Sequence, residues 1–281
     1  MRRAKRSLGQ NFLIDPNIQR KIVEAVDPGP NDEVLEIGPG TGALTRHLAG
    51  AVRRLVAVEL DDQLVAALRQ EFDGAPGVEI VHGNVLEQDL AELVEDVAAL
   101  KVVGNIPYNI TTPLIFWLLE RPVRPARIVL MVQKEVADRI MAQPGGKAYG
   151  ALSVGVRTVA EVERLFTVGR GAFRPVPDVD SAVIRITPYR PSPLSAEEEA
   201  DVRALSRTAF GWRRKQLQKI LRSAPGYRLD ADAVAAVCRE AGVEPSARPE
   251  TLDPDTFIRL ARALRAAGYP TDRAAANAEV E

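Results

Sequence analysis

The residues best suited to chemistry are Asn105, Ile106, Pro107 and Tyr108, which directly follow an apolar run. The Asn105 side-chain oxygen and the Ile106 carbonyl can accept both N–H bonds of one amino group. Tyr108 offers a ring face on which a base can stack, and Pro107 restricts the backbone. Because the lone pair of an adenine amino group is delocalised, two acceptors would help draw its nitrogen toward tetrahedral geometry. The four residues therefore predict a catalytic centre for adenine methylation, with Asn105 as an acceptor and not a base.

A second aromatic residue is predicted to complete this centre. Phe173 begins the segment Phe173–Pro177, in which two prolines restrict the loop between two expected strands. We expect the Phe173 ring to sandwich the target base opposite Tyr108. The competing interpretation is a proline-rich hairpin loop whose phenylalanine is packed inside the protein.

A glycine-rich turn predicts a cofactor site. The apolar run Glu33–Ile37 leads into Gly38–Gly42, which has the form Gly-x-Gly-x-Gly, and a helix is expected to follow. Gly38 and Gly40 let the backbone approach a ligand at the carboxyl edge of the sheet. The dinucleotide fingerprint would need a further glycine at Ala43, so the spacing favours S-adenosylmethionine, which carries no phosphate.

Three further segments are expected at this cofactor site. Glu59 ends the second expected strand, where its carboxylate can accept hydrogen bonds from the ribose hydroxyls. Asn84 follows the third strand and can reach the adenine ring of the cofactor. Residues 9–13, with the sequence GQNFL, form either a lid over the methionine end or an ordinary N-terminal cap. The alternative for the glycine turn and Glu59 is a tight structural turn with a surface glutamate.

The elements that must position these residues alternate between strand and helix. Strands are expected at Glu33–Ile37, Leu55–Leu60, Val78–His82, Lys101–Gly104 and Ala126–Gln133. Helices are expected at Ala43–Val52, Asp62–Phe72, Leu86–Ala98, Pro113–Glu120 and Lys134–Ala142. This alternation predicts an α/β fold, a parallel Rossmann-like sheet with helices on both faces. Val162–Val168 and Ser181–Thr187 are separated by too short a loop for a helical crossover, so an antiparallel pair is expected at the sheet edge, as in class I methyltransferases.

The chain changes character after the sheet. Pro188, Pro191 and Pro193 predict a linker. Helices are expected beyond it at 196–210, 213–223, 231–241 and 254–267. We therefore expect a catalytic domain over residues 1–190, a small all-helical RNA-binding domain over 191–270, and a disordered tail over 271–281.

Charge is unevenly distributed although the net charge is only -1. Between Val202 and Arg228 there are eight basic residues and no acidic one. This basic segment either binds a polyanion or forms a solvated helix face balanced by Glu197–Glu199. The candidate contacts with a polyanion are Arg207, Arg213, Arg214, Lys215, Lys219 and Arg222.

Composition excludes several classes of protein. Hydrophobic residues make up 46% and charged residues 27%, a balance that suits a buried core and excludes wholesale disorder. The single cysteine, Cys238, excludes an internal disulfide, and with only two histidines besides no metal site is expected. No run reaches the length of a membrane span, and no apolar signal follows the basic N-terminus. We therefore expect a cytoplasmic protein without membrane contacts.

Several motifs together resemble the small-subunit (16S) rRNA adenine dimethyltransferases of the KsgA/RsmA type, within the rRNA adenine N6-methyltransferase family. The resemblance covers essentially the whole chain. The most specific motifs are residues 9–13 (GQNFL), 105–113 (NIPYNITTP) and 173–181 (FRPVPDVDS). Residues 36–42, 149–154 and 213–215 also match.

The resemblance implies a cytoplasmic, monomeric enzyme that uses S-adenosylmethionine and leaves S-adenosylhomocysteine. It would place two methyl groups on N6 of each of two adjacent adenines in the hairpin near the 3′ end of 16S rRNA, within the immature small ribosomal subunit. The basic segment then becomes a surface for the rRNA backbone. The alternatives are a large-subunit rRNA adenine methyltransferase of the macrolide-resistance type and a non-catalytic ribosome assembly factor. Family cofactor contacts correspond to Asn11, Leu13, Gly38, Glu59, Asn105 and, where the family usually has Asp, Asn84.

Overall fold

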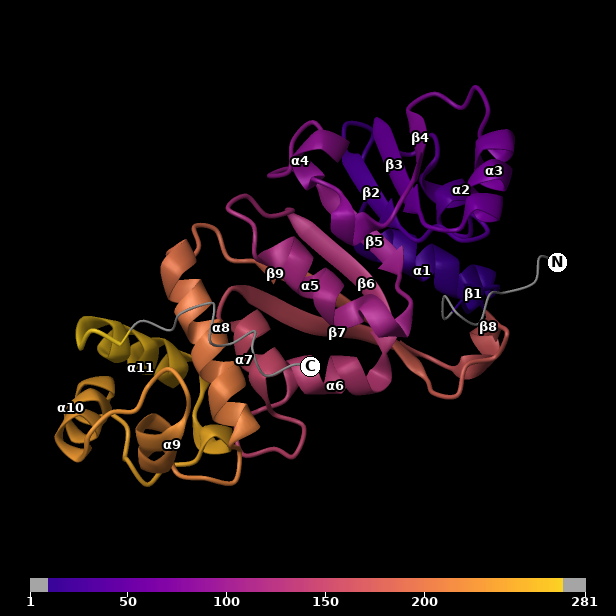
Figure 1. Ribbon diagram of the computed structural model, residues 1–281. Helices are drawn as coiled ribbons and strands as arrows, with labels where there is room; N and C mark the ends of the chain where they lie inside the picture. Colours follow the sequence, from indigo (N-terminus) through magenta and orange to yellow (C-terminus); the bar gives the residue numbers. More distant parts are fainter. Residues whose placement is uncertain (1–9, 270–281) are drawn as a thin grey trace. The chain divides into compact units, whose positions relative to one another are not determined.

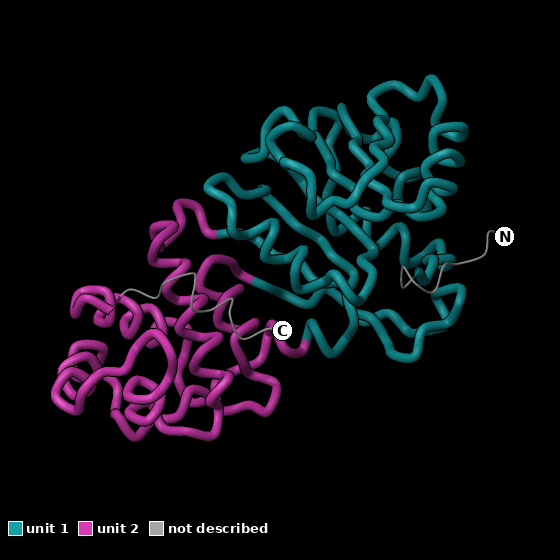
Figure 2. Tube along the Cα trace, in the orientation of Figure 1, with its two compact units in different colours: residues 1–137, 162–188 teal, residues 138–161, 189–281 magenta. Residues whose placement is uncertain are grey.

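The computed structural model describes residues 10–269 and divides into two compact units (Figure 2). Unit 1 comprises residues 1–137 and 162–188, and unit 2 comprises residues 138–161 and 189–281. The division after residue 188 lies close to the expected domain boundary at 190. Residues 138–161, which we expected in the catalytic domain, belong instead to unit 2. The expected tail at 271–281 lies outside the described residues.

Unit 1 is built on a seven-stranded sheet with the order β4-β3-β2-β5-β6-β9-β7 (Figure 1). The strands are β2 (Glu33–Ile37), β3 (Arg54–Glu59), β4 (Val78–His82), β5 (Lys101–Asn105), β6 (Arg127–Gln133), β7 (Ala160–Val168) and β9 (Ser181–Pro188). β4, β3, β2, β5 and β6 pair in parallel, and β9 pairs with β6 in antiparallel orientation. The five predicted parallel strands and the pair of further strands at the sheet edge are confirmed.

Strand β2 lies in the middle of the parallel part of the sheet, and all five of its residues are buried. A strand covered on both faces is rich in apolar residues, and Val34, Leu35 and Ile37 gave the pattern from which β2 was predicted. Its two acidic residues, Glu33 and Glu36, are buried as well. The helices associated with the sheet are α1 (Pro16–Val26), α2 (Thr45–Leu48), α3 (Asp62–Glu71), α4 (Leu90–Leu93), α5 (Thr111–Leu119) and α6 (Lys134–Met141).

Helix α1 was not among the predicted helices. Asp15 caps it by accepting hydrogen bonds from the backbone N–H groups of Asn17 and Ile18, and proline takes the first helical position. Its buried residues Ile22 and Val26 belong to the same hydrophobic core as sheet residues such as Val34. The capping signal was therefore present in the sequence.

Two of the helices predicted in unit 1 are shorter than expected. Within 43–52 only α2 is helical, and 86–98 contains the 3-10 turn η2 (Val85–Glu87) followed by the short α4. Beyond α4, a Glu33 carboxylate oxygen accepts hydrogen bonds from the backbone N–H groups of Glu95 and Asp96 at 2.9 and 3.3 Å. These bonds to a side chain 62 and 63 residues away take the place of helical hydrogen bonds, so apolar spacing overestimated the helix.

A second sheet of two strands joins the N-terminal segment to the connection between β7 and β9. β1 (Phe12–Leu13) pairs in antiparallel orientation with β8 (Phe173–Arg174), and Leu13 lies opposite Phe173. The Ile14 N–H extends this pairing by donating to the Ala172 carbonyl at 2.8 Å. Two motifs about 160 residues apart are thereby held side by side.

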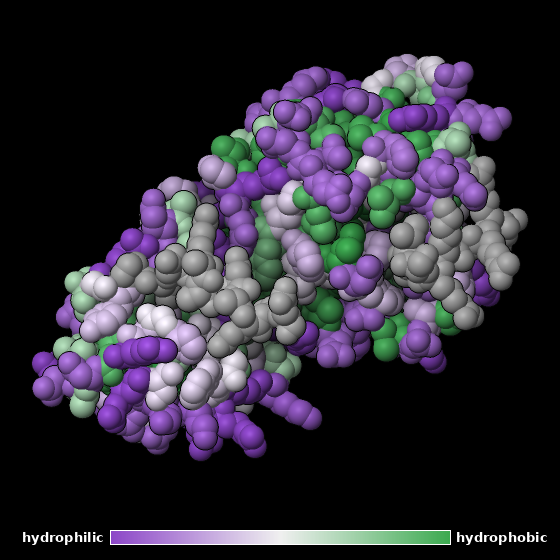
Figure 3. Space-filling model, in the orientation of Figure 1, coloured by the Kyte–Doolittle hydropathy of each residue, from purple (hydrophilic) through white to green (hydrophobic). Residues whose placement is uncertain are grey.

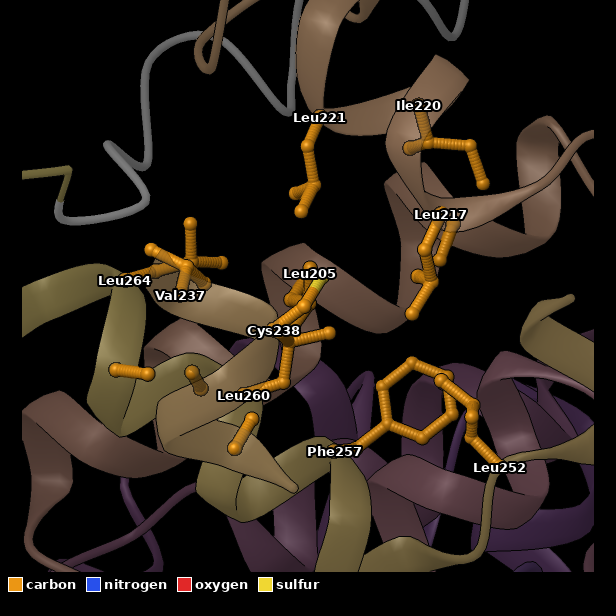
Figure 4. Close-up of a cluster of buried hydrophobic side chains, with 14 of the residues drawn as sticks. Leu205, Leu217, Ile220, Leu221, Val237, Cys238, Leu252, Phe257, Leu260 and Leu264 are labelled. Carbon is orange, nitrogen blue, oxygen red and sulfur yellow. The ribbon is translucent and has the colours of Figure 1, made fainter. Parts of the chain in front are cut away.

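Unit 2 is helical in its described residues and has its own hydrophobic core. Its helices after α6 are α7 (Ala151–Arg157), α8 (Ala196–Gly211), α9 (Leu217–Ser223), α10 (Ala231–Ala241) and α11 (Pro254–Ala266). The helices predicted at 196–210, 231–241 and 254–267 are confirmed, whereas the one predicted at 213–223 begins only at 217. Side chains from α8 to α11, including Leu205, Leu221, Cys238 and Phe257, converge in the core (Figure 4).

Tyr149 explains why residues 138–161 belong to unit 2. Its side chain is fully buried in the helical core, edge-on to the ring of Phe210. Its hydroxyl donates a hydrogen bond of 2.7 Å to the Leu252 carbonyl. Removing this segment from the helices would expose both the ring and an unpaired carbonyl.

The face of the protein shown in Figure 3 is largely hydrophilic, with scattered hydrophobic patches. None of the helices within residues 10–269 combines the length and the apolar character that crossing a bilayer requires.

Candidate active site

The carboxyl ends of β2, β3, β4 and β5 border one pocket of about 1250 Å³, its open mouth included. The order of the strands reverses between β2 and β5, and open α/β sheets bind ligands at that position. All the residues predicted to bind the cofactor line this pocket, and so do four of the five predicted catalytic residues, Asn105 belonging to both sets. They are Asn11, Leu13, Gly38, Gly40, Glu59, Asn84 and Asn105, together with Ile106, Pro107 and Tyr108.

Strands β2 and β5 leave no room for a side chain where Ile37 pairs with Gly104. A Cβ atom at position 104 would lie 2.7 Å from the Ile37 backbone oxygen and 2.5 Å from Ile106 Cδ1. Glycine is thus the residue that lets the two strands pair at this point. The pairing sets Gly38 beside Asn105, whose carbonyl oxygen lies 3.9 Å from the Cβ position of residue 38.

The Asn105 side chain has a defined orientation. Its Nδ2 donates a hydrogen bond of 3.0 Å to the Asn11 carbonyl, so Oδ1 is the end of the amide that accepts. The next peptide is fixed as well, because the Ile106 N–H donates to the Met131 carbonyl at 3.1 Å. The structure therefore brings the two predicted acceptors, the Asn105 side chain and the Ile106 backbone, to one place.

Tyr108 is held by the antiparallel edge of the sheet. Its hydroxyl lies 3.0 Å from Ser181 Oγ at the start of β9, within hydrogen-bonding distance. Burial raises the pKa of Tyr108 above its ordinary value, and Asp180 acts in the same direction. The phenol is therefore neutral near pH 7, and its half-buried ring forms part of the pocket wall.

Phe173 is placed differently from our prediction. Its side chain is 1% exposed and belongs to the core that contains Leu13 and Ala172. It is absent from the residues that line the pocket. The pairing of β8 with β1 turns this ring inward, so in this structure Phe173 offers no free face opposite Tyr108. The competing interpretation of a packed phenylalanine describes the observed position.

Glu59 is a buried carboxylate held by the backbone. Its Oε2 accepts from Gly40 N at 3.0 Å and its Oε1 accepts from Asp61 N at 2.9 Å. Burial raises the pKa of Glu59, while these N–H groups oppose the rise. Because the side chain is only 6% exposed, the alternative of a surface glutamate is wrong. Each oxygen retains a lone pair with which it can accept a further hydrogen bond from a ligand hydroxyl.

The N-terminal segment closes one side of the pocket. Gln10 Nε2 donates to Asp61 Oδ2 at 3.2 Å, which ties the segment to the residues after β3. The Phe12 ring lies over the glycine turn, 3.3 Å from the Cβ position of Gly40. Gly40 also has a φ of +60°, a conformation that favours glycine. The predicted lid is thus in contact with the predicted cofactor turn.

Asn84 is engaged in the turn that follows β4. Its Oδ1 accepts from Leu86 N at 3.2 Å and thereby caps η2, and its Nδ2 donates to Glu87 Oε1 at 2.9 Å. The side chain lines the pocket. Its contact with the adenine of a cofactor stays a prediction.

Sequence reasoning missed one buried group in this site. Glu36 is 1% exposed and lines the same pocket, yet it was quoted only as part of a motif. Its Oε2 has no hydrogen-bond partner among the described residues. The available signal was an acidic residue inside an otherwise apolar strand, because such a residue is rarely buried without a role.

The basic segment lies in unit 2, and one of its members has a structural role. The Arg213 guanidinium donates to the Gly146 and Lys147 carbonyls, at 3.0 Å in each case. The other candidates have exposed side chains on α8, on α9 or between them: Arg207, Arg214, Lys215, Lys219 and Arg222. Among the described residues there is no group of three or more His, Cys, Asp or Glu residues that could hold a metal ion.

Comparison with known proteins identifies the family. The family model described as ribosomal RNA adenine dimethylase matches residues 1–263. The chain belongs to this family.

Relatives within and around the family cover almost the entire chain. A ribosomal RNA small subunit methyltransferase A of Geobacter metallireducens is 46% identical over 95% of this chain and 97% of its own length. The protein of the same name from Pseudomonas syringae is 43% identical over 93% of this chain and 95% of its own. Among solved structures, a Plasmodium falciparum dimethyladenosine transferase is 26% identical with a TM-score of 0.78, covering 93% of this chain and 100% of that one. The 23S rRNA methyltransferase ErmE is 30% identical with a TM-score of 0.68, covering 91% and 100%.

Replacing Gly104 tests the close approach of β2 and β5. We expect Gly104→Ala to lower the free energy of unfolding by about 1–3 kcal/mol, because the new methyl group meets backbone. Chemical denaturation measures the change. Gly169→Ala is the matched control, since nothing lies within 4 Å of its Cβ position and its φ is -68°. Equal stability of the two variants would contradict the steric argument.

Proposed function

We propose that this protein transfers methyl groups from S-adenosylmethionine to the N6 amino groups of two adjacent adenines in the hairpin near the 3′ end of 16S rRNA. The product would be N6,N6-dimethyladenosine, formed during biogenesis of the small ribosomal subunit. The protein would act as a cytoplasmic monomer on the immature subunit. Membership of the ribosomal RNA adenine dimethylase family and the small-subunit relatives support this choice of substrate.

The orientation of Asn105 is the observation that carries the proposal. Its Nδ2 is bonded to Asn11, so Oδ1 can accept one N–H bond of the target amine while the Ile106 carbonyl accepts the other. Two fixed acceptors orient the amine lone pair away from the ring plane. Asn105 has no proton-accepting function, so the amine proton leaves only after the transfer.

The pocket fits the proposed cofactor in its donors and acceptors. S-adenosylmethionine supplies a methyl group activated on a sulfonium. Glu59 would accept bonds from the ribose hydroxyls, and Gly38 and Gly40 leave room for backbone approach. Phe12 and Leu13 would cover the methionine end, and Asn84 would lie at the adenine end. The buried, unpartnered oxygen of Glu36 marks a polar group that a ligand can satisfy.

A large-subunit rRNA adenine methyltransferase is the second candidate function. The observation in its favour is the similarity to the 23S rRNA methyltransferase ErmE at 30% identity. The small-subunit relatives, at 46% and 43% identity, favour the 16S substrate. A non-catalytic assembly factor is disfavoured because Glu59, Asn105 and Tyr108 line one intact pocket.

A substrate panel tests the proposal. The protein is incubated with labelled S-adenosylmethionine and with unmethylated small subunits, naked 16S rRNA, large-subunit rRNA or DNA, and the labelled nucleosides are identified after digestion. Labelled N6,N6-dimethyladenosine from small-subunit RNA is expected. Label confined to large-subunit rRNA would favour the second candidate, and no label in any substrate would favour the assembly factor.

Asn105→Ala should abolish most of the methyl transfer. Loss of one positioned acceptor is expected to reduce the turnover rate by about 100- to 1000-fold. Single-turnover kinetics and rRNA binding are measured together, because binding should persist. Asn17→Ala, an exposed asparagine on α1, is the matched control and should retain full activity. Turnover by Asn105→Ala within a few-fold of the original protein would refute the proposed centre.

Neutralising the exposed basic residues should weaken the salt dependence of rRNA binding. For Arg214→Gln with Lys215→Gln, each lost phosphate contact should make the slope of log K against log salt shallower by about 0.7–0.9. Arg239→Gln with Arg248→Gln removes two exposed charges from another part of unit 2 as a control. If both pairs of substitutions leave the slope unchanged, the basic segment is a solvated face.

A further inference from the structure

Glu36 sits in the middle of the sheet, with its side chain at the edge of the pocket. It lies opposite Ala57 of β3 and Val103 of β5, both apolar. The residue is 1% exposed and lines the pocket together with Glu59 and Asn105. A carboxyl group in such surroundings is costly unless something compensates its charge.

The two buried glutamates of the pocket differ in their partners. Both oxygens of Glu59 accept backbone N–H bonds, from Gly40 and Asp61. Thr45 is the hydrogen-bonding neighbour of Glu36, whose Oε2 makes no well-formed hydrogen bond among the described residues. Both oxygens of Glu59 are therefore satisfied by the fold itself, whereas Oε2 of Glu36 is left for a ligand or a proton to satisfy.

The charged groups around Glu36 do not compensate it in the absence of a ligand. Burial raises the pKa of Glu36 to about 7, and the negative Glu59 on β3 contributes in the same direction. Hydrogen bonds from the side chain and backbone of Thr45 oppose the rise, and so does the positive charge of Arg46, both at the start of α2. No charged residue of β5 lies opposite Glu36, since that position is Val103. Near pH 7 the group is thus poised between its two protonation states.

We propose that Glu36 is the counter-charge for the sulfonium of the cofactor: it is ionised when the pocket holds S-adenosylmethionine and takes up a proton when the pocket is empty or holds the uncharged thioether product. The proposal deepens the proposed function and rests on it, because it assumes that this pocket binds the cofactor. It makes Glu36 a group that distinguishes cofactor from product by charge.

The charge balance of the reaction fits this assignment. The methyl group leaves sulfur with the formation of an N–C bond, and the positive charge passes to the target amine, which then releases one proton to solvent. Glu36 loses its counter-ion at that step and binds one proton from solvent. Cofactor binding in the next cycle releases that proton again, so the group returns to its starting state.

The sign of the pH dependence follows from the position of the pKa. Below about pH 7 Glu36 is protonated in the empty pocket and must release a proton when the cationic cofactor binds. The affinity for S-adenosylmethionine should therefore fall as the pH decreases from 7 to 6, by up to tenfold per pH unit. The affinity for S-adenosylhomocysteine should stay nearly constant, because no sulfonium is present.

Titration calorimetry in two buffers of different ionisation enthalpy counts the protons directly. At pH 6.0 we expect the original protein to release close to one proton more on binding S-adenosylmethionine than on binding S-adenosylhomocysteine. In Glu36→Gln, the isosteric neutral variant, this difference should vanish. The ratio of the two dissociation constants should change with pH in the original protein and be flat in the variant, which corrects for titration of the ligands themselves.

Equal proton counts for the two ligands in the original protein would overturn the role of Glu36 and leave the proposed function standing. That comparison needs no variant, so it decides the question even if Glu36→Gln fails to fold. An unchanged difference in Glu36→Gln would likewise overturn the proposal, since another group would be the source of the proton. Absence of binding of either ligand would overturn the proposed function and this inference together.

Unfolding supplies a second readout that needs no ligand. The pKa of Glu36 rises from 4.5 to about 7 on folding, so between these values the folded protein binds more protons than the unfolded chain. The contribution of Glu36 to stability should fall across this window and be constant above it. Relative to Glu36→Gln, the Tm of the original protein should therefore decrease from pH 4.5 to pH 7. A constant difference in Tm would show that Glu36 stays ionised in the empty pocket.

Discussion

The pairing of β2 with β5 at Ile37 and Gly104 is the constraint on which the site depends. Parallel strands bring their carboxyl ends to one edge, but only a residue without a side chain allows these two to approach so closely. The glycine turn after β2, where we propose that the cofactor binds, and the Asn-Ile-Pro-Tyr segment after β5 therefore start from adjacent positions. In the proposed function, the sheet thus brings the binding sites of methyl donor and acceptor together before any ligand binds.

The segments around this edge determine which side-chain atoms in the pocket donate hydrogen bonds and which accept them. The N-terminal strand β1 places the Asn11 carbonyl against Asn105 Nδ2, and its pairing with β8 ties that contact to the antiparallel edge of the sheet. The same edge holds Tyr108 through Ser181. Side chains in the pocket thus have defined donor and acceptor ends. Glu36 keeps one buried oxygen without a well-formed hydrogen bond, which is why we propose that it responds to the charge of a ligand.

Sequence alone predicted most of the fold, because strands buried on both faces read as apolar runs. It also named Gly38, Glu59, Asn84 and Asn105 in the pocket, since these lie at the ends of strands that must meet, but it missed Glu36 within a strand. The predictions from sequence failed where contacts between residues far apart in the chain determine the local structure. Glu33 binds the backbone at Glu95 and shortens a helix, and the pairing of β8 with β1 turns Phe173 inward. The Arg213 guanidinium donates hydrogen bonds to the carbonyls of a loop that is distant in the sequence. A count of charges along the chain cannot predict such a structural role.

In the proposed reaction, Asn105 and Ile106 accept both N–H bonds of an adenine amine in front of the cofactor pocket. A crystal structure of the protein with S-adenosylhomocysteine and adenosine monophosphate tests it most directly. We expect the adenine amine within hydrogen-bonding distance of Asn105 Oδ1 and the Ile106 carbonyl, with the Asn105–Asn11 bond retained and the cofactor ribose bound to Glu59. An adenine amine bonded elsewhere, or an Asn105 amide turned so that Nδ2 faces the base, would contradict it.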